Sequence, residues 1–149
     1  MGCAIATTAL DILIDERLSE RAEDLGEKFR SGIRKLKSPL VSEVRGRGLL
    51  NAVVIDESKS TRGRTAWQFC LLLKSRGVLA KPTHVNMYSP MYPPPLAILV
   101  DILYPSRIRF APPLVIEEAD LLRSIEIIGE ALKDLDTVST LFWKPPSIR

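Results

Sequence analysis

The chain has few of the side chains that build metal sites and nucleophile sites. Its 149 residues include one histidine, His84, and two cysteines, Cys3 and Cys70, which lie far apart in the sequence. A zinc site needs three or four such ligands, so these residues predict no metal site. His84 has no obvious serine or cysteine nucleophile as a partner, which favours a structural role for it. The cysteines are interpreted as buried free thiols of a reducing compartment rather than as a disulfide.

Long apolar runs and phosphate-binding loops are missing as well. The most apolar stretch, residues 95–104, is too short to cross a bilayer and contains Asp101. No basic region precedes the apolar residues at the N-terminus, which argues against a signal peptide. Residues 45–48 have neither the glycine spacing nor the following helix of a nucleotide-binding loop. We therefore expect no membrane-spanning segment and no nucleotide site.

The charge balance is close to neutral, with 21 basic and 18 acidic residues and a net charge of +3. Along residues 19–37 the acidic side chains come first and the basic ones last: Glu20, Glu23 and Asp24, then Arg30, Arg34, Lys35 and Lys37. This order complements a helix dipole, so the basic cluster needs no nucleic-acid partner to explain it. The hydrophobic content of 46% is ordinary for one globular domain.

Helical periodicity predicts four helices. Residues 2–15 are apolar on most faces, which is typical of a helix buried against a partner surface. Ser19 is expected to cap a second helix that ends near Lys37. A third helix is expected over residues 65–76, with Gly77 just after its end. The last helix is marked by apolar residues at helical spacing: Leu121, Ile125, Ile128, Leu132 and Leu135.

Four short strands complete the expected fold. Residues 41–45 and 49–55 are rich in branched apolar side chains, with a turn or bulge at 46–48. Residues 78–80 and 107–110 are expected to be strands that pair with each other. This order of helices and strands predicts an α+β fold, a small and mostly antiparallel sheet with helices packed on one face.

Two segments differ in composition from the rest. Residues 87–106 contain a Pro-Pro-Pro run and a single charge, and we interpret them as an insertion into a hairpin loop. A polyproline ligand for an aromatic groove is the alternative interpretation. Residues 137–149 are expected to form a loosely ordered tail.

Arg109 is the candidate binding residue. It stands at the end of a short apolar strand, which Pro112 and Pro113 must stop because proline lacks an N–H and has a fixed φ. A guanidinium held on a rigid strand end presents a planar fork that matches a carboxylate. A surface ion pair is the alternative role for this side chain.

Four segments then occur in one characteristic order: Gly2–Ala6 (GCAIA), Val44–Ala52 (VRGRGLLNA), Gly77–His84 (GVLAKPTH) and Arg109–Leu114 (RFAPPL). Together they resemble the C-terminal part of the ornithine aminotransferases, a family of class-III pyridoxal-phosphate aminotransferases of fold type I. The resemblance covers residues 1–84 and 107–135. It implies that residues 1–136 are the family's C-terminal small domain, interrupted at 87–106.

The resemblance implies transfer of the δ-amino group of ornithine to 2-oxoglutarate, which gives glutamate semialdehyde and glutamate. This reaction serves proline biosynthesis and arginine catabolism. Arg109 matches the family's arginine that binds a substrate carboxylate, and a glutamate of the large domain masks it when ornithine is bound. The family forms dimers or larger assemblies. It is cytosolic in fungi and mitochondrial in animals and plants, and we expect a cytoplasmic location here.

The same resemblance implies that the family's large domain is not part of this sequence. The family's cofactor-binding large domain precedes the equivalent of Met1, and no lysine of this chain matches the one that binds pyridoxal phosphate. We therefore expect no catalytic residue, no cofactor-binding residue and no activity from the chain alone. The alternative is a non-catalytic interaction module, in which the apolar helix at residues 2–15 binds a full-length subunit.

Overall fold

The computed structural model describes residues 2–83 and 107–138, which form helices and four short strands. The elements, in chain order, are α1 (Gly2–Asp15), α2 (Leu18–Lys35), β1 (Val41–Arg47), β2 (Leu50–Ile55), the short 3-10 helix η1 (Glu57–Lys59), α3 (Ala66–Ser75), β3 (Lys81–Thr83), β4 (Arg107–Phe110) and α5 (Glu118–Asp134). His84, the segment 87–106 and most of the predicted tail lie outside the described residues.

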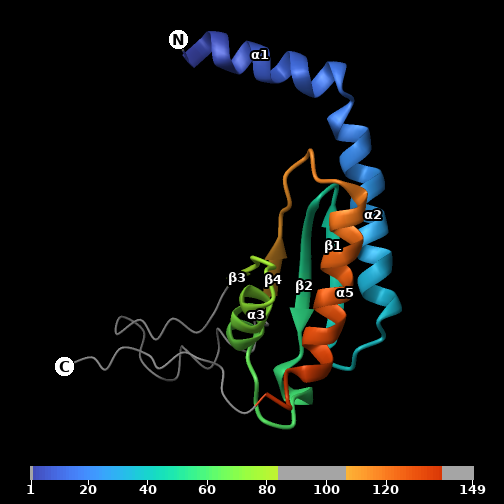
Figure 1. Cartoon of the computed structure of the whole chain (residues 1–149), viewed down its shortest axis with the longest axis vertical. Helices are drawn as coiled ribbons and strands as arrows, with labels where there is room; N and C mark the ends of the chain where they lie inside the picture. The colour runs from blue at the N-terminus through green and yellow to red at the C-terminus, as the bar shows by residue number, and fades with distance from the viewer. Residues whose placement is uncertain (1, 84–106, 139–149) are drawn as a thin grey trace, which may run out of the picture.

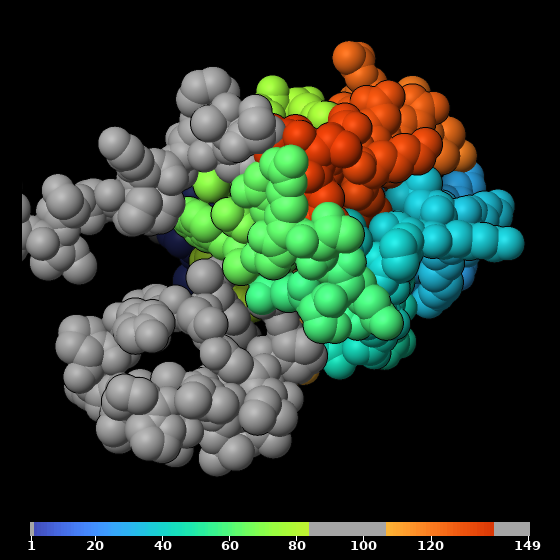
Figure 2. All heavy atoms as spheres, turned by 90° about the horizontal axis from the view of Figure 1, so that it is seen from below, coloured from blue at the N-terminus to red at the C-terminus, as the bar shows by residue number. Residues whose placement is uncertain are grey.

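The strands form one antiparallel sheet in the order β1-β2-β4-β3. Helices α2, α3 and α5 lie on one face of this sheet (Figure 1). Seen from below, α5 lies between α3 and the C-terminal part of α2 (Figure 2). The predicted α+β class, with helices on one face of a small sheet, is confirmed. Within the described ranges, no helix combines the length and apolarity that a bilayer crossing requires.

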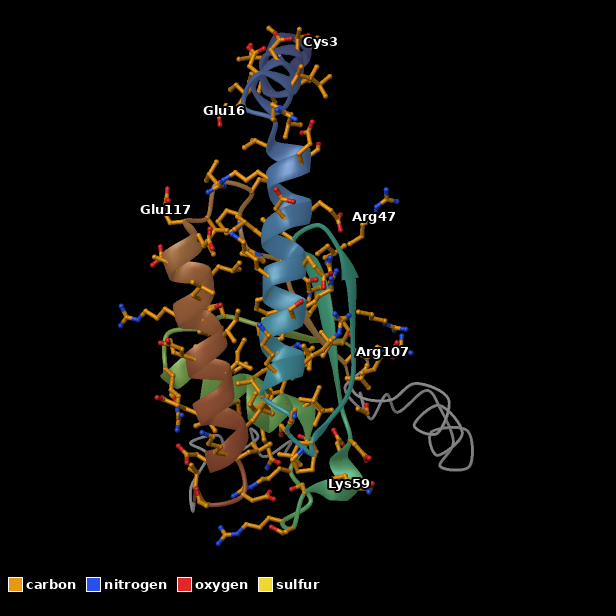
Figure 3. All side chains as sticks on the ribbon, turned by 90° about the vertical axis from the view of Figure 1, so that its right-hand side faces the viewer. Cys3, Glu16, Arg47, Lys59, Arg107 and Glu117 are labelled. Carbon is orange, nitrogen blue, oxygen red and sulfur yellow. The ribbon has the colours of Figure 1, made fainter. Side chains whose placement is uncertain are left out.

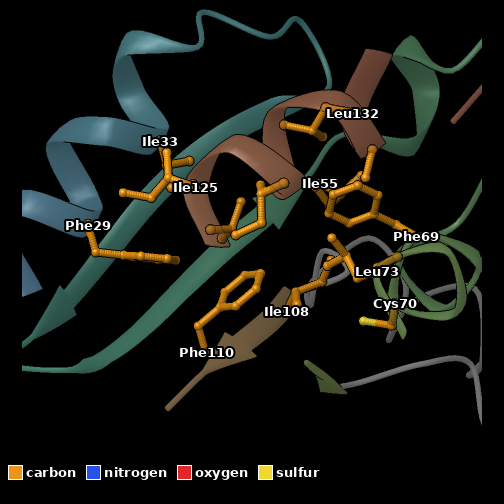
Figure 4. Close-up of a cluster of buried hydrophobic side chains, with 14 of the residues drawn as sticks. Phe29, Ile33, Ile55, Phe69, Cys70, Leu73, Ile108, Phe110, Ile125 and Leu132 are labelled. Carbon is orange, nitrogen blue, oxygen red and sulfur yellow. The ribbon is translucent and has the colours of Figure 1, made fainter. Parts of the chain in front are cut away.

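The core fills the space between the sheet and these three helices (Figure 4). On β4, Ile108 is 0% exposed and Phe110 is 5% exposed. The rings of Phe29 and Phe110 lie 5.4 Å apart between centroids, in a tilted pair. The core receives large side chains from every layer: Phe29 and Ile33 of α2, Ile55 of β2, Phe69 and Leu73 of α3, and Ile125 and Leu132 of α5. Alternation along β4 therefore fixes which of its residues face away from the helices.

The turn between β1 and β2 lies at Gly48 and Leu49, later in the sequence than predicted. Strand β1 continues through Gly46 to Arg47, and Arg47 pairs with Leu50. Only two residues make the turn, and the first of them, Gly48, has a φ of 54°. Glycine reaches this left-handed conformation without the penalty that other residues pay. The prediction of a turn at 46–48 was wrong because Gly46 keeps its place in the ladder.

The strand predicted at 78–80 is also displaced, to Lys81–Thr83. Gly77 follows α3 with a φ of 88°, as predicted. Its N–H donates to the Lys74 carbonyl, and the N–H of Val78 donates to the Leu73 carbonyl. These bonds form a Schellman motif, which uses the Val78 N–H that a strand would need. The chain is free to pair with β4 only beyond this cap.

Helix α2 begins without the predicted cap. Ser19 is the second residue of the helix, and the N-cap is Arg17, which has a left-handed φ of 49° and makes no side-chain cap bond. This conformation separates α1 from α2, so that α1 projects away from the sheet (Figure 1). Thr65, in contrast, caps α3 in a complete capping box with Gln68.

The expected burial of residues 2–15 is not met within the described chain. No residue of α1 is buried. Ile5 is 67% exposed and Ile14 is 72% exposed, and Leu10 and Ile12 are exposed as well. The expectation that Cys3 is a buried thiol is wrong for the same reason, whereas Cys70 is buried in the core and both are free.

The two thiols should therefore react very differently. Burial raises the pKa of the Cys70 thiol to about 12, and the thiolate is the reactive form. We expect a thiol reagent such as Ellman's reagent to label one thiol per native chain and two in denaturant. Cys3→Ser should abolish the native signal. Rapid labelling of Cys70 in the native Cys3→Ser chain would contradict this packing.

Asp136 ties the end of α5 to the loop before α3. Its carboxylate accepts hydrogen bonds from the Ser60 hydroxyl (2.5 Å), the Thr61 N–H (2.9 Å) and the Thr61 hydroxyl (3.0 Å). These donors, Ser60 first, lower the pKa of Asp136 below its ordinary value. The stabilisation is thus present above the ordinary aspartate pKa of about 3.9 and is lost as the pH falls through the lowered pKa.

We accordingly expect the stability of the Asp136→Asn variant to depend less on pH below about pH 4. Urea unfolding midpoints of the wild type should fall more steeply below about pH 4 than those of the variant. At neutral pH the variant should be the less stable of the two. Parallel profiles below pH 4 would show that Asp136 contributes nothing to the acid sensitivity.

Candidate functional site

Arg109 lies on the face of the sheet opposite the helices. Alternation along β4 buries Ile108 and Phe110 and leaves Arg109 exposed. Within residues 2–83 and 107–138, its guanidinium forms no ion pair and no side-chain hydrogen bond. The described chain therefore contains no acidic partner for Arg109, which the alternative role in a surface ion pair would need. The five donors of the guanidinium are available to an external anion.

Cross-strand register places Arg109 in a row of four residues on this face. Arg109 pairs with Ala52 on one side and with Lys81 on the other, and Ala52 pairs with Arg45. Directly paired residues lie on the same face of a sheet. The row therefore runs Arg45, Ala52, Arg109, Lys81 from β1 to β3, and we call it the arginine row.

The neighbouring rows add further positive charge to the same face. Arg107 lies two residues before Arg109, and Arg47 lies two residues after Arg45. Figure 3 shows both side chains on the side of the sheet away from α2 and α5. The Nε atom of Arg107 is buried and has no hydrogen-bond partner in the part of the chain that the structure describes. Among the described residues of β1 to β4, Glu43 is the single acidic side chain. This face is thus suited to anions.

The loop that leaves β4 is held by an arginine of α2. The guanidinium of Arg21 donates to the carbonyl of Leu114 and to that of Ile116, each at 2.6 Å. Together with Pro112 and Pro113, these bonds fix the path of the chain directly after Arg109. Arg21 is thus a positioning residue that the sequence did not reveal, because its two acceptors lie more than 90 residues away.

The β1–β2 hairpin, which carries Arg45, is fixed to α2 by a second arginine, Arg30, which is buried. Arg30 is 4% exposed. It donates to the Gly48 carbonyl and to Oδ1 of Asn51, both at 3.0 Å. Its charge is balanced by Glu23 at 3.1 Å and Glu27 at 3.0 Å. The arginine row therefore rests on a hairpin whose turn cannot shift without breaking this network.

A groove of about 630 Å³ lies at the end of the sheet, between the start of α2, the hairpin turn and the loop after β4. Ser19, Glu23, Arg47, Leu50 and Pro112 are among its lining residues, and Arg109 is not. The groove has both acidic and basic side chains, so its charge does not single out one class of ligand. It lies beside the arginine row rather than within it.

The described residues do not fit a pyridoxal-phosphate site. Every described lysine is exposed: Lys28, Lys35, Lys37, Lys59, Lys74, Lys81 and Lys133. A lysine that binds this cofactor works through a shifted pKa in a desolvated pocket, which an exposed side chain does not have. Within the same residue ranges, no group of histidine, cysteine and carboxylate side chains could hold a metal ion. What the described strands do present is a sheet face with several basic side chains.

Comparisons with known proteins identify the family of this chain. The model of the class-III aminotransferase family matches residues 1–132. The ornithine aminotransferase of Schizosaccharomyces pombe is 52% identical over 138 residues, which are 93% of this chain and 27% of that protein. The chain thus spans about a quarter of the length of this curated relative.

Solved structures give the same family. An ornithine aminotransferase from Toxoplasma gondii is 33% identical with a TM-score of 0.69, and the match covers 91% of this chain and 27% of that one. An acetylornithine aminotransferase from Elizabethkingia anophelis is 46% identical with a TM-score of 0.67, covering 89% and 29%. Because the family match runs through the helices, the sheet and Arg109, the chain belongs to the class-III aminotransferases.

Proposed function

We propose that this chain supplies the C-terminal small domain of an ornithine aminotransferase, over residues 1–136 with an insertion at 87–106. In the whole enzyme, an amino group of ornithine is transferred to a 2-oxo acid, giving glutamate semialdehyde and an amino acid. Relatives that carry the name ornithine aminotransferase support the substrate. The observation that carries the proposal is the exposed guanidinium of Arg109, which has no partner among residues 2–83 and 107–138, on a sheet face rich in positive charge.

Arg109 binds a substrate carboxylate in this proposal. Its backbone is fixed by pairing on both sides, so little ordering is needed when an anion binds. Its planar fork accepts a carboxylate in a bidentate pair. Arg21 contributes indirectly, because it holds the loop that follows the strand. Arg109→Gln is expected to weaken binding of 2-oxoglutarate to the full chain.

The chain alone is proposed to be inactive. When bound, pyridoxal phosphate supplies the electron sink of a transaminase. All described lysines are exposed, including Lys37, Lys59 and Lys133, which line a pocket of about 400 Å³. We expect the chain mixed with pyridoxal phosphate to show no absorbance of lysine-bound cofactor and no change on adding ornithine. An absorbance band that depends on one particular lysine, and that ornithine removes, would contradict this expectation.

A second candidate function rests on α1. Its exposed apolar side chains, including Ile5, Leu10 and Ile14, form a surface that is costly to leave in water. The alternative role is a non-catalytic interaction module that binds a full-length aminotransferase subunit. Native mass spectrometry of the chain mixed with a full-length relative tests it. A mixed complex that Leu10→Glu dissociates would support this role, and two separate species would exclude it.

A further inference from the structure

A pocket separate from the arginine row lies where the ends of α2 and α5 meet the loop that contains η1. Figure 2 shows these three segments side by side on the face seen from below. The pocket has a volume of about 400 Å³, which is within the range of sites for small molecules. Lys37, Lys59 and Lys133 line it, and we call it the lysine pocket.

The floor of the lysine pocket is apolar. Leu40 and Leu132 line it and are buried in the core. Leu36 completes the floor by packing against the bare backbone of Gly129, where an added Cβ atom would lie 2.9 Å from the Cδ2 atom of Leu36. A floor of this kind can cover the apolar part of a ligand and so contribute to its binding.

The three lysines reach the pocket from three different segments. Lys37 follows α2, Lys59 ends η1, and Lys133 lies in the last turn of α5. Among residues 2–83 and 107–138, none of them has a partner in an ion pair or in a side-chain hydrogen bond. Three like charges therefore face one small space, and an anion would relieve their repulsion.

The ends of the helices explain part of this positive charge but not all of it. The C-termini of α2 and α5 each carry about half a negative charge, which a lysine offsets. Asp136 is the single acid among the described lining residues, and Ser60 and Thr61 already donate to its carboxylate. The three lysines exceed these negative groups, so the pocket keeps a net positive charge.

The backbone at Lys37 is an independent feature of the same pocket. Lys37 directly follows the C-cap of α2 and has a left-handed φ of 48°. Glycine is favoured at this position because it pays no steric penalty there. Lysine therefore occupies a place where glycine would be more stable. Strain that the fold retains beside a pocket of ligand size points to a function of the side chain.

Lysine at all three positions favours a phosphate over a carboxylate. An ammonium is a compact charge whose three donors can turn toward a tetrahedral anion, whereas a carboxylate is matched by the planar fork of arginine. A phosphate monoester has three terminal oxygens and about two negative charges at neutral pH. It can meet ammonium groups from three sides while its ester group reaches the apolar floor.

We propose that the lysine pocket binds a small phosphate monoester, with the phosphate between Lys37, Lys59 and Lys133 and an apolar body on the leucine floor. The ammonium groups hold the phosphate by charge and hydrogen bonds, and no covalent step takes place. The pocket lies on the helix side of the sheet, whereas Arg109 lies on the opposite face. The inference therefore stands apart from the carboxylate-binding role proposed above.

Nuclear magnetic resonance of the full chain tests the inference with three probes at constant ionic strength. Phenyl phosphate has both the phosphate and an apolar body, methyl phosphate lacks the large body, and benzoate has a carboxylate in place of the phosphate. We expect phenyl phosphate to shift the amides of Leu36 and Gly129 and to bind about threefold or more tightly than either of the others. Lys59→Gln and Lys133→Gln should each weaken its binding by about threefold or more.

Two further variants separate the pocket from general charge and from folding. Lys35→Gln removes the same charge from the last turn of α2, outside the pocket lining, and should bind phenyl phosphate as the wild type does. Lys37→Gly should weaken binding by about threefold or more, although its urea unfolding midpoint should equal or exceed that of the wild type. Lys37→Gly provides the test if a glutamine variant does not fold.

Four outcomes overturn the inference. They are the absence of shifts at Leu36 and Gly129 in the wild type, equal losses in Lys35→Gln and Lys59→Gln, wild-type affinity in Lys37→Gly, and benzoate or methyl phosphate that binds as tightly as phenyl phosphate. Arg109→Gln should leave the shifts at the pocket unchanged. Failure of phenyl phosphate to bind, with normal carboxylate binding at Arg109, would leave the proposed function standing.

Discussion

Gly26→Ala is expected to destabilise the chain by about 3 kcal/mol or more, although alanine is the better helix former. Gly26 is buried at the place where α2 passes the hairpin turn. A Cβ atom added there would overlap the carbonyl oxygen and carbon of Gly48. Both neighbours are backbone, so neither can turn aside as a side chain could. Urea denaturation at neutral pH measures the loss.

Gly32→Ala is the matched control, on the same helix and with the same change. Its Cβ would lie 2.7 Å from the terminal Cδ1 atom of Ile125. That methyl is the far end of a flexible side chain and can move. The gain in helix propensity is about 1 kcal/mol and opposes the remaining strain, so the net change should stay within about 1 kcal/mol. Equal losses in the two variants would contradict the close approach of α2 to the turn.

Replacing Arg30 by methionine has the second-largest expected effect, a loss of about 3 kcal/mol. The change leaves the Gly48 carbonyl and the Asn51 side chain without their buried donor. It also leaves Glu23 and Glu27 close together without the cation between them. Methionine fills much of the same volume, so the loss reports the polar network rather than a cavity.

Arg34→Met provides the comparison for Arg30. Arg34 lies one turn later on α2, is 52% exposed and pairs with Glu27 at 3.3 Å. A solvated pair of this type is worth at most about 1 kcal/mol. Similar losses of stability at Arg30 and Arg34 would mean that the buried network contributes no additional stability. Gly26 and Arg30 both meet Gly48, so their effects should not add in a double variant.

Local sequence signals predicted the fold where the chemistry is local. The helix predicted over residues 65–76 and the glycine predicted just after it, Gly77, depend on residues a few positions apart. Predictions failed where a competing bond decided the outcome. Val78 donates to the helix cap instead of a strand, and Gly46 stays in the ladder instead of the turn. The helical pattern of residues 2–15 predicted α1, but the burial that its apolar side chains led us to expect is not met in the described chain.

The candidate site was predicted only in part. The Pro112–Pro113 pair is visible in the sequence, so the position of Arg109 near the end of a strand could be predicted. Register is not visible, because one residue of slip moves every side chain to the other face. Arg45 and Lys81 join the arginine row through pairings with Ala52 and Arg109, which the sequence did not specify.

Arg109, on the sheet face opposite the helices, is the residue that we propose binds a substrate carboxylate. The most direct test of this role maps 2-oxoglutarate onto the full chain by chemical-shift changes, in the wild type and in Arg109→Gln. The account predicts shifts centred on Arg109 and Ala52 that disappear in the variant, while the amides of α5 stay unchanged. Shifts centred on the groove beside Pro112, or shifts that survive in Arg109→Gln, would contradict it.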